Sequence, residues 1–330
     1  MLKYHGYKTQ NNPNEVVEKD VLLVVNPVSG GGNARKATPE VIQEFERRNR
    51  NVEVYCTSGS QDVISLTSRM ADSIAQFKTI AILSGDSTIM EFVQDELSKN
   101  KGKWPYAPIM HLPGGTSNVV CSECFGKEVT VKEIFEMETC VKKGSVVQCS
   151  NSDNERKYAV HVAFTGFQAF LIDRLEESRS GILYNTFGRL ILPFLLLKAI
   201  ISYHFNPSVP NLCSVFISDI ENKGLVDMKF GISRFDKDAR LVSIFKKDYE
   251  GIRSNISIMA RLMKGVLGEE YKCGKVDNST FSILVTNKWN VKLESKQRFY
   301  FDGSNAIWLE GKDIDLEVLP RSIPYYVRRE

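Results

Sequence analysis

Apolar segments alternate with helix-forming segments throughout the first half of the chain. The apolar segments have the length of buried strands: VLLVVN at 21–26, VEVYC at 52–56, TIAIL at 79–83 and APIMHL at 107–112. The first intervening helix is expected to begin at Thr38, with Pro39 in its first position. Apolar strands that alternate with helices are typical of a parallel sheet covered on both faces. We therefore expect an α/β N-terminal domain, with the loop after each strand at the carboxyl edge of the sheet.

The second half has a different pattern, in which short β-type runs predominate. Two helical segments interrupt these runs, around 182–204 and 253–266. Short strands separated by turn signals predict a mostly antiparallel, sandwich-like domain. The polar stretch CSNSDNERK at 149–157 suggests the boundary between the halves. We therefore expect an α/β domain at 20–150, a β-rich domain at 151–320 whose final strands can return to the first domain, and a flexible N-terminus at 1–19.

Two Gly-rich loops follow predicted strands at the same edge of the sheet. NPVSGGGNARK at 26–36 contains neither the GxxxxGK[ST] phosphate loop nor the GxGxxG dinucleotide fingerprint. LPGGTSNVV at 112–120 adds the hydroxyl and amide groups of Thr116, Ser117 and Asn118. Backbone N–H groups of such loops, and of helix N-termini, bind anions. Together the two loops predict a phosphate site along this edge.

The segment SGDST at 84–88 adds a carboxylate at the same edge. A carboxylate repels phosphate, so Asp86 is unsuited to binding the phosphate itself. Its presence indicates that it binds Mg²⁺ or accepts a proton from an attacking hydroxyl group. The three loops therefore predict phosphoryl transfer, a reaction that depends mainly on positioning and charge stabilisation.

Composition argues against several other classes of protein. The 330 residues are 42% hydrophobic and 25% charged, which is typical of a globular chain of about two domains. A formal net charge of +3 gives no reason to expect nucleic-acid binding. Seven scattered cysteines suggest reduced thiols in the cytoplasm, and the four histidines lack metal-ligand spacing. The N-terminus has no apolar signal segment, and the longest apolar run, at 190–201, is shorter than a membrane span.

The order of these motifs resembles that of the diacylglycerol-kinase-type lipid kinases, which include sphingosine and ceramide kinases. The matching segments, from about residue 20 to 325, are NPVSGGG, SGDST with its downstream Glu91, LPGGTSN, GFQAF and YFDGS. SGD is the form found in sphingosine kinases. The resemblance implies an ATP-binding α/β domain, a β-sandwich that holds lipid, and Mg²⁺-dependent transfer of the γ-phosphoryl group to a lipid hydroxyl.

The resemblance also assigns roles to individual residues. Asp86 is expected to be the catalytic residue, as general base or as organiser of the Mg²⁺ that accompanies ATP. Phe167, Phe170 and Asp173 are expected at the lipid-binding site. The expected nucleotide-binding residues are Asn26, Pro27, Ser29, Gly30, Gly31, Gly32, Thr57, Ser84, Gly85, Ser87, Glu91, Gly115, Thr116, Ser117, Asn118, Arg179, Asp302 and Ser304.

Three positions depart from the family pattern. Ser87 replaces the glycine that follows the aspartate of GGDGT, Phe170 replaces an aspartate that anchors the lipid head group, and Ser304 replaces the glutamate of DGE. If the glycine provides a positive φ, serine at position 87 strains the backbone by about 1–3 kcal/mol. If it only allows a close approach, the serine hydroxyl can replace a contact. The departures leave the acceptor, and turnover itself, open.

The sequence therefore predicts an ATP-dependent lipid kinase. A sphingoid base is the first acceptor, with ceramide and diacylglycerol as alternatives. Two other hypotheses are a soluble-substrate kinase of the NAD-kinase type and a catalytically degenerate pseudokinase that binds lipid or a partner. The apolar segment at 186–205 fits either an interior helix or a lid that touches a membrane. We expect peripheral membrane contact, no nucleic acid, and a chain compatible with a homodimer.

Overall fold

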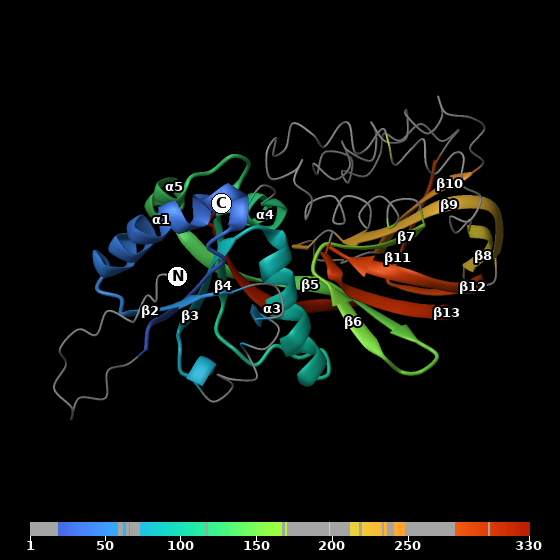
Figure 1. The fold of residues 1–330 in the computed structure, drawn as a ribbon, viewed down its shortest axis with the longest axis horizontal. Helices are drawn as coiled ribbons and strands as arrows, with labels where there is room; N and C mark the ends of the chain where they lie inside the picture. The colour runs from blue at the N-terminus through green and yellow to red at the C-terminus, as the bar shows by residue number, and fades with distance from the viewer. Residues whose placement is uncertain are drawn as a thin grey trace. The chain divides into compact units, whose positions relative to one another are not determined.

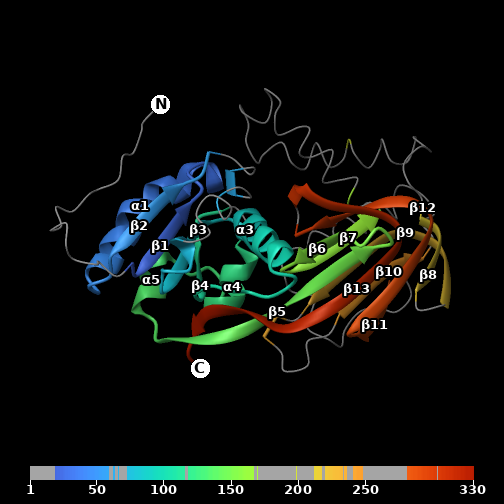
Figure 2. The same ribbon diagram turned by 90° about the horizontal axis from the view of Figure 1, so that it is seen from below.

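The computed structural model describes residues 19–58, 62–63, 66, 73–115, 118–166, 169, 198, 212–217, 220–232, 234–235, 241–247, 281–302 and 304–330. The chain divides into two compact units. The first comprises Met1–Gly144 and Arg321–Glu330, and the second comprises Ser145–Pro320. Helices and strands alternate in the first unit, whereas the described elements of the second are mainly strands (Figures 1 and 2). The predicted fold class, α/β followed by β-rich, is confirmed.

A parallel sheet forms the centre of the first unit. Its order is β2–β1–β3–β4, and its strands are Val52–Cys56, Val21–Val25, Thr79–Ser84 and Ile109–Pro113. All residues of β1 and β3 are buried, as expected for inner strands of a parallel sheet, whereas β2 lies at the edge and is largely exposed. The end of β13 (Ser304–Arg328) joins this sheet, where Tyr325 pairs in parallel with Ile109.

Helix α1 (Ser29–Glu46) begins well before Thr38, so the predicted start is wrong. The Thr38 hydroxyl donates a hydrogen bond to the Ala34 carbonyl at 2.8 Å, one turn back, and therefore serves the helix interior rather than a cap. The φ angles of Gly30, Gly31 and Gly32 are 60°, 69° and 91°. The Gly-rich motif is thus a left-handed turn at the start of the helix.

Two further helices follow strands of the sheet. Helix α3 (Asp86–Lys99) comes directly after β3, and α4 (Val119–Phe125) comes after β4. Most residues of α3 are buried, including Glu91 and Glu96. Charged side chains are rarely buried without a partner or a function, and Glu96 accepts a hydrogen bond from the side-chain amide of Asn100 at 3.3 Å.

Helix α5 (Val131–Glu136) packs against the end of α1. Thr130 and Glu133 form a capping box that fixes where α5 begins. The ring of Phe135 meets that of Phe45 edge to face, with the ring centroids 4.8 Å apart. This contact brings together segments far apart in the sequence.

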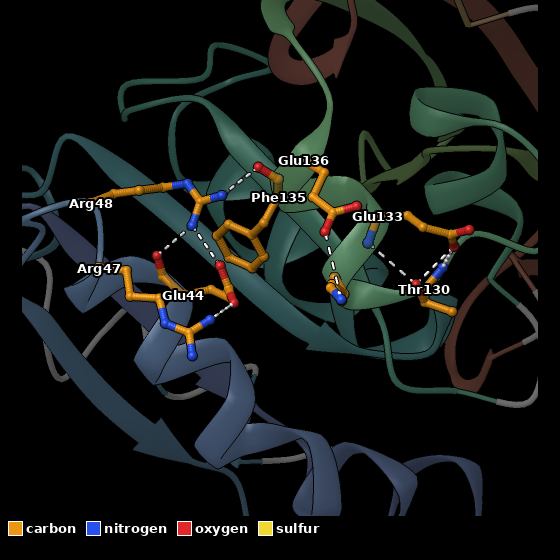
Figure 3. Close-up of polar contacts among 8 residues, drawn as sticks. Glu44, Arg47, Arg48, Thr130, Glu133, Phe135 and Glu136 are labelled. Carbon is orange, nitrogen blue, oxygen red and sulfur yellow. Dashed lines mark hydrogen bonds and ion pairs between the residues drawn. The ribbon is translucent and has the colours of Figure 1, made fainter.

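Charged side chains reinforce the same helix pair (Figure 3). Glu44 accepts hydrogen bonds from Arg47 and Arg48, which hold the pKa of its carboxyl below the usual value. The Arg48 guanidinium also donates to the carbonyl of Phe135 and lies 5.0 Å from the centroid of that ring. The last turn of α1 is therefore fastened to α5 by apolar and polar contacts together.

The second unit is an antiparallel β-structure. β9 pairs with β7, β8 and β10, and β12 pairs with β7, β8 and β13. The buried rings of Phe230, Trp289 and Phe299 pack together in its core, with centroids 6.4 Å apart in each pair that includes Phe230. The strands before β13 are β5 (Thr139–Asn151), β6 (Arg156–Ala159), β7 (Val162–Gly166), β8 (Leu212–Ile217), β9 (Ile220–Ile232), β10 (Leu241–Lys247), β11 (Phe281–Thr286) and β12 (Lys288–Phe301).

Several predictions fall outside the described residues. They are the helical segments around 182–204 and 253–266, the apolar segment at 186–205 apart from Lys198, and the site candidates Thr116, Ser117, Phe167, Phe170, Asp173 and Arg179. Within the part of the chain that the structure describes, every helix is too short or too polar to cross a bilayer. The described cysteines, at positions 56, 121, 124, 140 and 149, are free thiols.

Candidate functional site

Three loops lie at the carboxyl edge of the parallel sheet. Their described residues are 26–32 after β1, 84–88 after β3, and 113–115 and 118 after β4. Because β1 and β4 both pair with β3 in parallel, the loops leave the sheet on the same side and start from neighbouring strands. Contacts between specific atoms hold the three loops together.

Asn26 and Ser29 tie the first loop to the second. The Asn26 Nδ2 donates to Thr88 Oγ1 at 3.1 Å, and its Oδ1 accepts from the backbone N of Val28 at 3.3 Å. The Ser29 Oγ accepts from the backbone N of Gly85 at 2.9 Å. Both side chains therefore position the loops, because their hydrogen bonds are made inside the protein.

Gly30 and Gly114 bring the first and third loops into backbone contact. A Cβ on Gly30 would lie 2.5 Å from the carbonyl oxygen of Gly114, and one on Gly114 would lie 2.9 Å from the backbone N of Ser84. Neither position has room for a side chain. A Cβ on Gly31 or Gly32 would meet nothing within 4 Å, so the left-handed turn borders open space. Such space beside exposed backbone N–H groups can take an anionic ligand.

Asp86 ties the second loop to the third. Its Oδ2 accepts from the backbone N of Val119 at 2.8 Å, and its Oδ1 accepts from that of Val120 at 3.0 Å. These N–H groups belong to the first turn of α4, which the carboxylate caps from outside the helix. Asn118 closes its own loop, because its side chain accepts from the N of Gly115 and donates to the O of the same residue. A carboxylate has about four acceptor positions, so Asp86 keeps capacity for a further ligand.

Ser87 lies in the first turn of α3 and is exposed. It is not among the residues with positive φ, so the backbone strain considered for this substitution is absent. Its hydroxyl makes no hydrogen bond with any described residue. Position 87 therefore accepts a side chain without distorting the backbone. Of the two reasons considered for a glycine here, a positive φ is excluded for this chain, and a close approach, in which the serine hydroxyl can replace a contact, is left.

Thr57 carries a buried hydroxyl at the end of β2. Its backbone N donates to the carbonyl of Val25 at 2.8 Å, which holds it beside the start of the first loop. The residue is 5% exposed, and its Oγ1 has no hydrogen-bond partner among the described residues. An unsatisfied buried hydroxyl group destabilises a protein by about 1–3 kcal/mol. The Thr57 hydroxyl is therefore suited to a hydrogen bond with a bound ligand. Ser84 differs, because its Oγ donates to the carbonyl of Gly85 at 2.9 Å.

Asp302 lies in the second unit, at the turn between β12 and β13. Its carboxylate accepts from the backbone N of Val160 at 2.6 Å, from that of His161 at 2.7 Å, and from that of Val162. Burial raises its pKa to about 6, although His161 and these N–H groups act in the opposite direction. The carboxylate thus clamps the backbone before β7. Ser304 begins β13, and its side chain lies outside the described part.

The family model of the diacylglycerol kinase catalytic domain matches residues 20–147. This segment is similar to a diacylglycerol kinase catalytic domain. The match contains all three loops, together with Asp86 and Thr57, and it supports a lipid kinase. No curated protein was found to match the chain.

Solved structures extend the likeness beyond the catalytic domain. A diacylglycerol kinase from Bacillus anthracis str. Sterne is 13% identical, with a TM-score of 0.61, and the alignment covers 96% of this chain and 98% of that one. Two candidate diacylglycerol kinases from the same strain are 13% and 15% identical, both with a TM-score of 0.63 and coverage of 94% of this chain and 98% of theirs. At these identities the likeness establishes a common fold.

The described residues of the catalytic domain fit a nucleotide better than a metal ion bound by protein alone. The space beside Gly31 and Gly32 and the unpartnered Thr57 hydroxyl suit phosphate and hydroxyl groups of a ligand. No group of three or more His, Cys, Asp or Glu side chains that could hold a metal occurs among the residues described. A Mg²⁺ ion next to Asp86 would therefore need phosphate oxygens and water as its other ligands.

Sequence reasoning missed two residues of this site. Thr88 is 1% exposed and receives the hydrogen bond of Asn26, and Gly114 provides the backbone contact with the first loop. Both belong to motifs that had been singled out, SGDST and LPGG. Their partners lie far away in the chain, so the pattern of either motif alone does not reveal the contacts.

Proposed function

We propose that this protein transfers the γ-phosphoryl group of ATP to a lipid hydroxyl group, with a sphingoid base as first acceptor. One observation carries the proposal: three loops at the carboxyl edge of β1, β3 and β4 are joined through Ser29, Asn26 and Asp86. Open α/β sheets bind ligands at this edge. The first turn of α3 has no side-chain cap among the described residues, and its N–H groups suit phosphate.

The proposed nucleotide site uses backbone groups more than side chains. The N–H groups of residues 30–32 and 116–118 would hold phosphates, whereas those of Ser29 and Gly115 already donate to Asn26 and Asn118. The Thr57 hydroxyl would accept or donate a ligand hydrogen bond. Asp86 would face the metal through the acceptor positions that its bonds to Val119 and Val120 leave open. When bound, Mg²⁺ would neutralise charge on the phosphates. We favour this metal-ordering role over that of general base, because both Asp86 oxygens already accept backbone N–H groups.

The acceptor is proposed from the SGD form of the second loop, which resembles sphingosine kinases. A lipid with a primary hydroxyl group supplies its own nucleophile, so the protein needs no nucleophilic side chain. We propose that the second unit holds the lipid, with Phe167, Phe170 and Asp173 at the lipid site, and that the protein takes its substrate from a membrane surface to which it binds peripherally.

A transfer assay tests the proposal. The purified full chain is incubated with γ-labelled ATP, Mg²⁺ and micelles that contain sphingosine, ceramide or diacylglycerol, with NAD in a separate reaction. We expect label in sphingosine, and a loss of about 100-fold or more in Asp86→Asn. The matched control is Asp95→Asn, the same change on the same helix, where the carboxylate pairs with Lys99. It should retain the activity of the unmodified protein.

Each other outcome changes a defined part of the proposal. Label in ceramide or diacylglycerol alone reassigns the acceptor, and label in NAD alone replaces the lipid by a soluble substrate. Nucleotide binding without transfer to any acceptor indicates a pseudokinase. Equal transfer by the unmodified protein and Asp86→Asn removes the role given to Asp86.

A further inference from the structure

Most described polar side chains of the three loops already make hydrogen bonds within a loop or between loops. Asn26 bonds to Thr88 and Val28, and Ser29 accepts from Gly85. These residue types are common phosphate ligands, yet here they hold the backbone in place. Among the described residues of the three loops, the side-chain donors that remain for a bound nucleotide are therefore hydroxyl groups.

Two described hydroxyl groups at this edge make no hydrogen bond with the rest of the described chain. One is that of Thr57, which is buried and unpartnered at the end of β2. The other is that of Ser87, which is exposed in the first turn of α3. The two differ in depth, so they suit different parts of a ligand: a buried hydroxyl meets a group that enters the protein, and an exposed one meets a group near the entrance.

Ser87 lies in the first turn of α3, the turn that also carries Asp86. It directly follows Asp86, the one carboxylate within the described residues of the three loops. The phosphoryl group that is transferred must lie near that carboxylate, or near the metal that it orders, for either to act on the reaction. The other phosphates have the Gly turn at 30–32 as their donor.

We propose that the Ser87 hydroxyl donates a hydrogen bond to the terminal phosphate of the bound nucleotide and so makes the site selective for a triphosphate over a diphosphate. The proposal rests on the proposed kinase function and assigns Ser87 to the γ-phosphate. Serine in place of the family's glycine then adds a hydrogen-bond donor to the site. The helical backbone accommodates serine at this position without strain. A hydrogen bond to a charged group changes affinity by roughly tenfold or more.

Calorimetric titration with two ligands tests this assignment without any lipid. The probes are ADP and the β,γ-imido analogue of ATP, each with Mg²⁺, and the variants are Ser87→Ala, Ser87→Gly and Ser87→Thr. In Ser87→Ala and Ser87→Gly the Kd of the analogue should rise about tenfold, and the Kd of ADP should stay unchanged. Ser87→Thr keeps the hydroxyl and should keep the selectivity. Ser98→Ala, at an exposed position near the other end of α3, is the matched control.

The outcomes separate this assignment from the function on which it rests. Equal weakening of both ligands in Ser87→Ala would show that the hydroxyl does not distinguish the terminal phosphate, and unchanged affinities would show that it makes no contact. Tighter binding by Ser87→Gly would show that the serine obstructs the site. Any of these results overturns the assignment while nucleotide binding stands. Failure of the unmodified protein to bind either ligand would overturn the proposed function, and this assignment with it.

Discussion

Glu91 is a carboxylic acid in an apolar environment on α3. Its side chain is 4% exposed, and its neighbours in the sequence, Met90 and Phe92, are also buried. Burial raises its pKa from 4.5 to about 7, because the charged form loses its hydration. The folded state therefore binds a proton that the unfolded chain releases near pH 4.5. This contribution to stability is fully present below pH 4.5 and is lost as the pH rises through 7.

Glu91→Gln should remove this pH dependence. At about pH 8.5 the ionised carboxylate costs the folded state about 3 kcal/mol, so the glutamine variant should exceed the unmodified protein in free energy of unfolding by about that amount. Near pH 4.5 the two proteins should be equally stable. Urea unfolding across this range measures the difference, with Glu46→Gln, an exposed position on α1, as control. Parallel curves for Glu91→Gln and the unmodified protein would contradict the assigned shift.

At the scale of secondary-structure elements, the three loops at the carboxyl edge of the sheet pack against one another. The close approach of Gly30 to the Gly114 carbonyl leaves no room for a side chain at position 30 unless the start of α1 or the loop after β4 moves. Gly31 shares the left-handed conformation but borders open space. Substitutions at Gly30 and Gly31 can therefore separate the effect of backbone conformation from the effect of loop packing.

Gly30→Ala and Gly31→Ala should differ in stability. Both alanines adopt a positive φ, which costs about 1 kcal/mol. Only Gly30→Ala also forces a Cβ to within 2.5 Å of a backbone oxygen, so the loops must shift. We expect the free energy of unfolding to fall by about 1 kcal/mol in Gly31→Ala and by several kcal/mol in Gly30→Ala, measured by urea unfolding at pH 7.5. Equal losses would show that the two loops separate freely.

Some features of these elements could be predicted from the sequence and others could not. The parallel strands could be predicted because apolar runs such as TIAIL report burial directly, and strand direction then places the loops at one edge. The start of α1 could not, because Thr38 followed by Pro39 has the local pattern of an N-cap, whereas a left-handed Gly turn has no periodic pattern. The roles of Asn26 and Ser29 depend on partners more than fifty positions away, at Thr88 and Gly85, and such pairings follow from the fold.

At the scale of the whole molecule, Asp302 has two possible roles. It was predicted to bind the nucleotide, but its contacts can also be those of a residue that stabilises the fold. Sequence reasoning assigned it to the nucleotide from the DG motif. In the structure it belongs to the second unit, where its carboxylate accepts three backbone N–H groups from residues 160–162 and so joins β12 to the start of β7. These contacts favour a structural role for Asp302 and connect segments that are widely separated in the chain.

The two roles of Asp302 predict opposite results for Asp302→Asn. At pH 7.5, above its pKa of about 6, the native side chain is an ionised acceptor for all three N–H groups. An asparagine directs its own N–H₂ group at one or more of them, so we expect the free energy of unfolding to fall by about 2–3 kcal/mol. Nucleotide affinity, measured with the same ADP titration, should be retained. Asp313→Asn, at an exposed position on β13, controls for the loss of charge. A large loss of nucleotide affinity with unchanged stability would instead make Asp302 a ligand, because a clamp cannot be removed without loosening the strands that it joins.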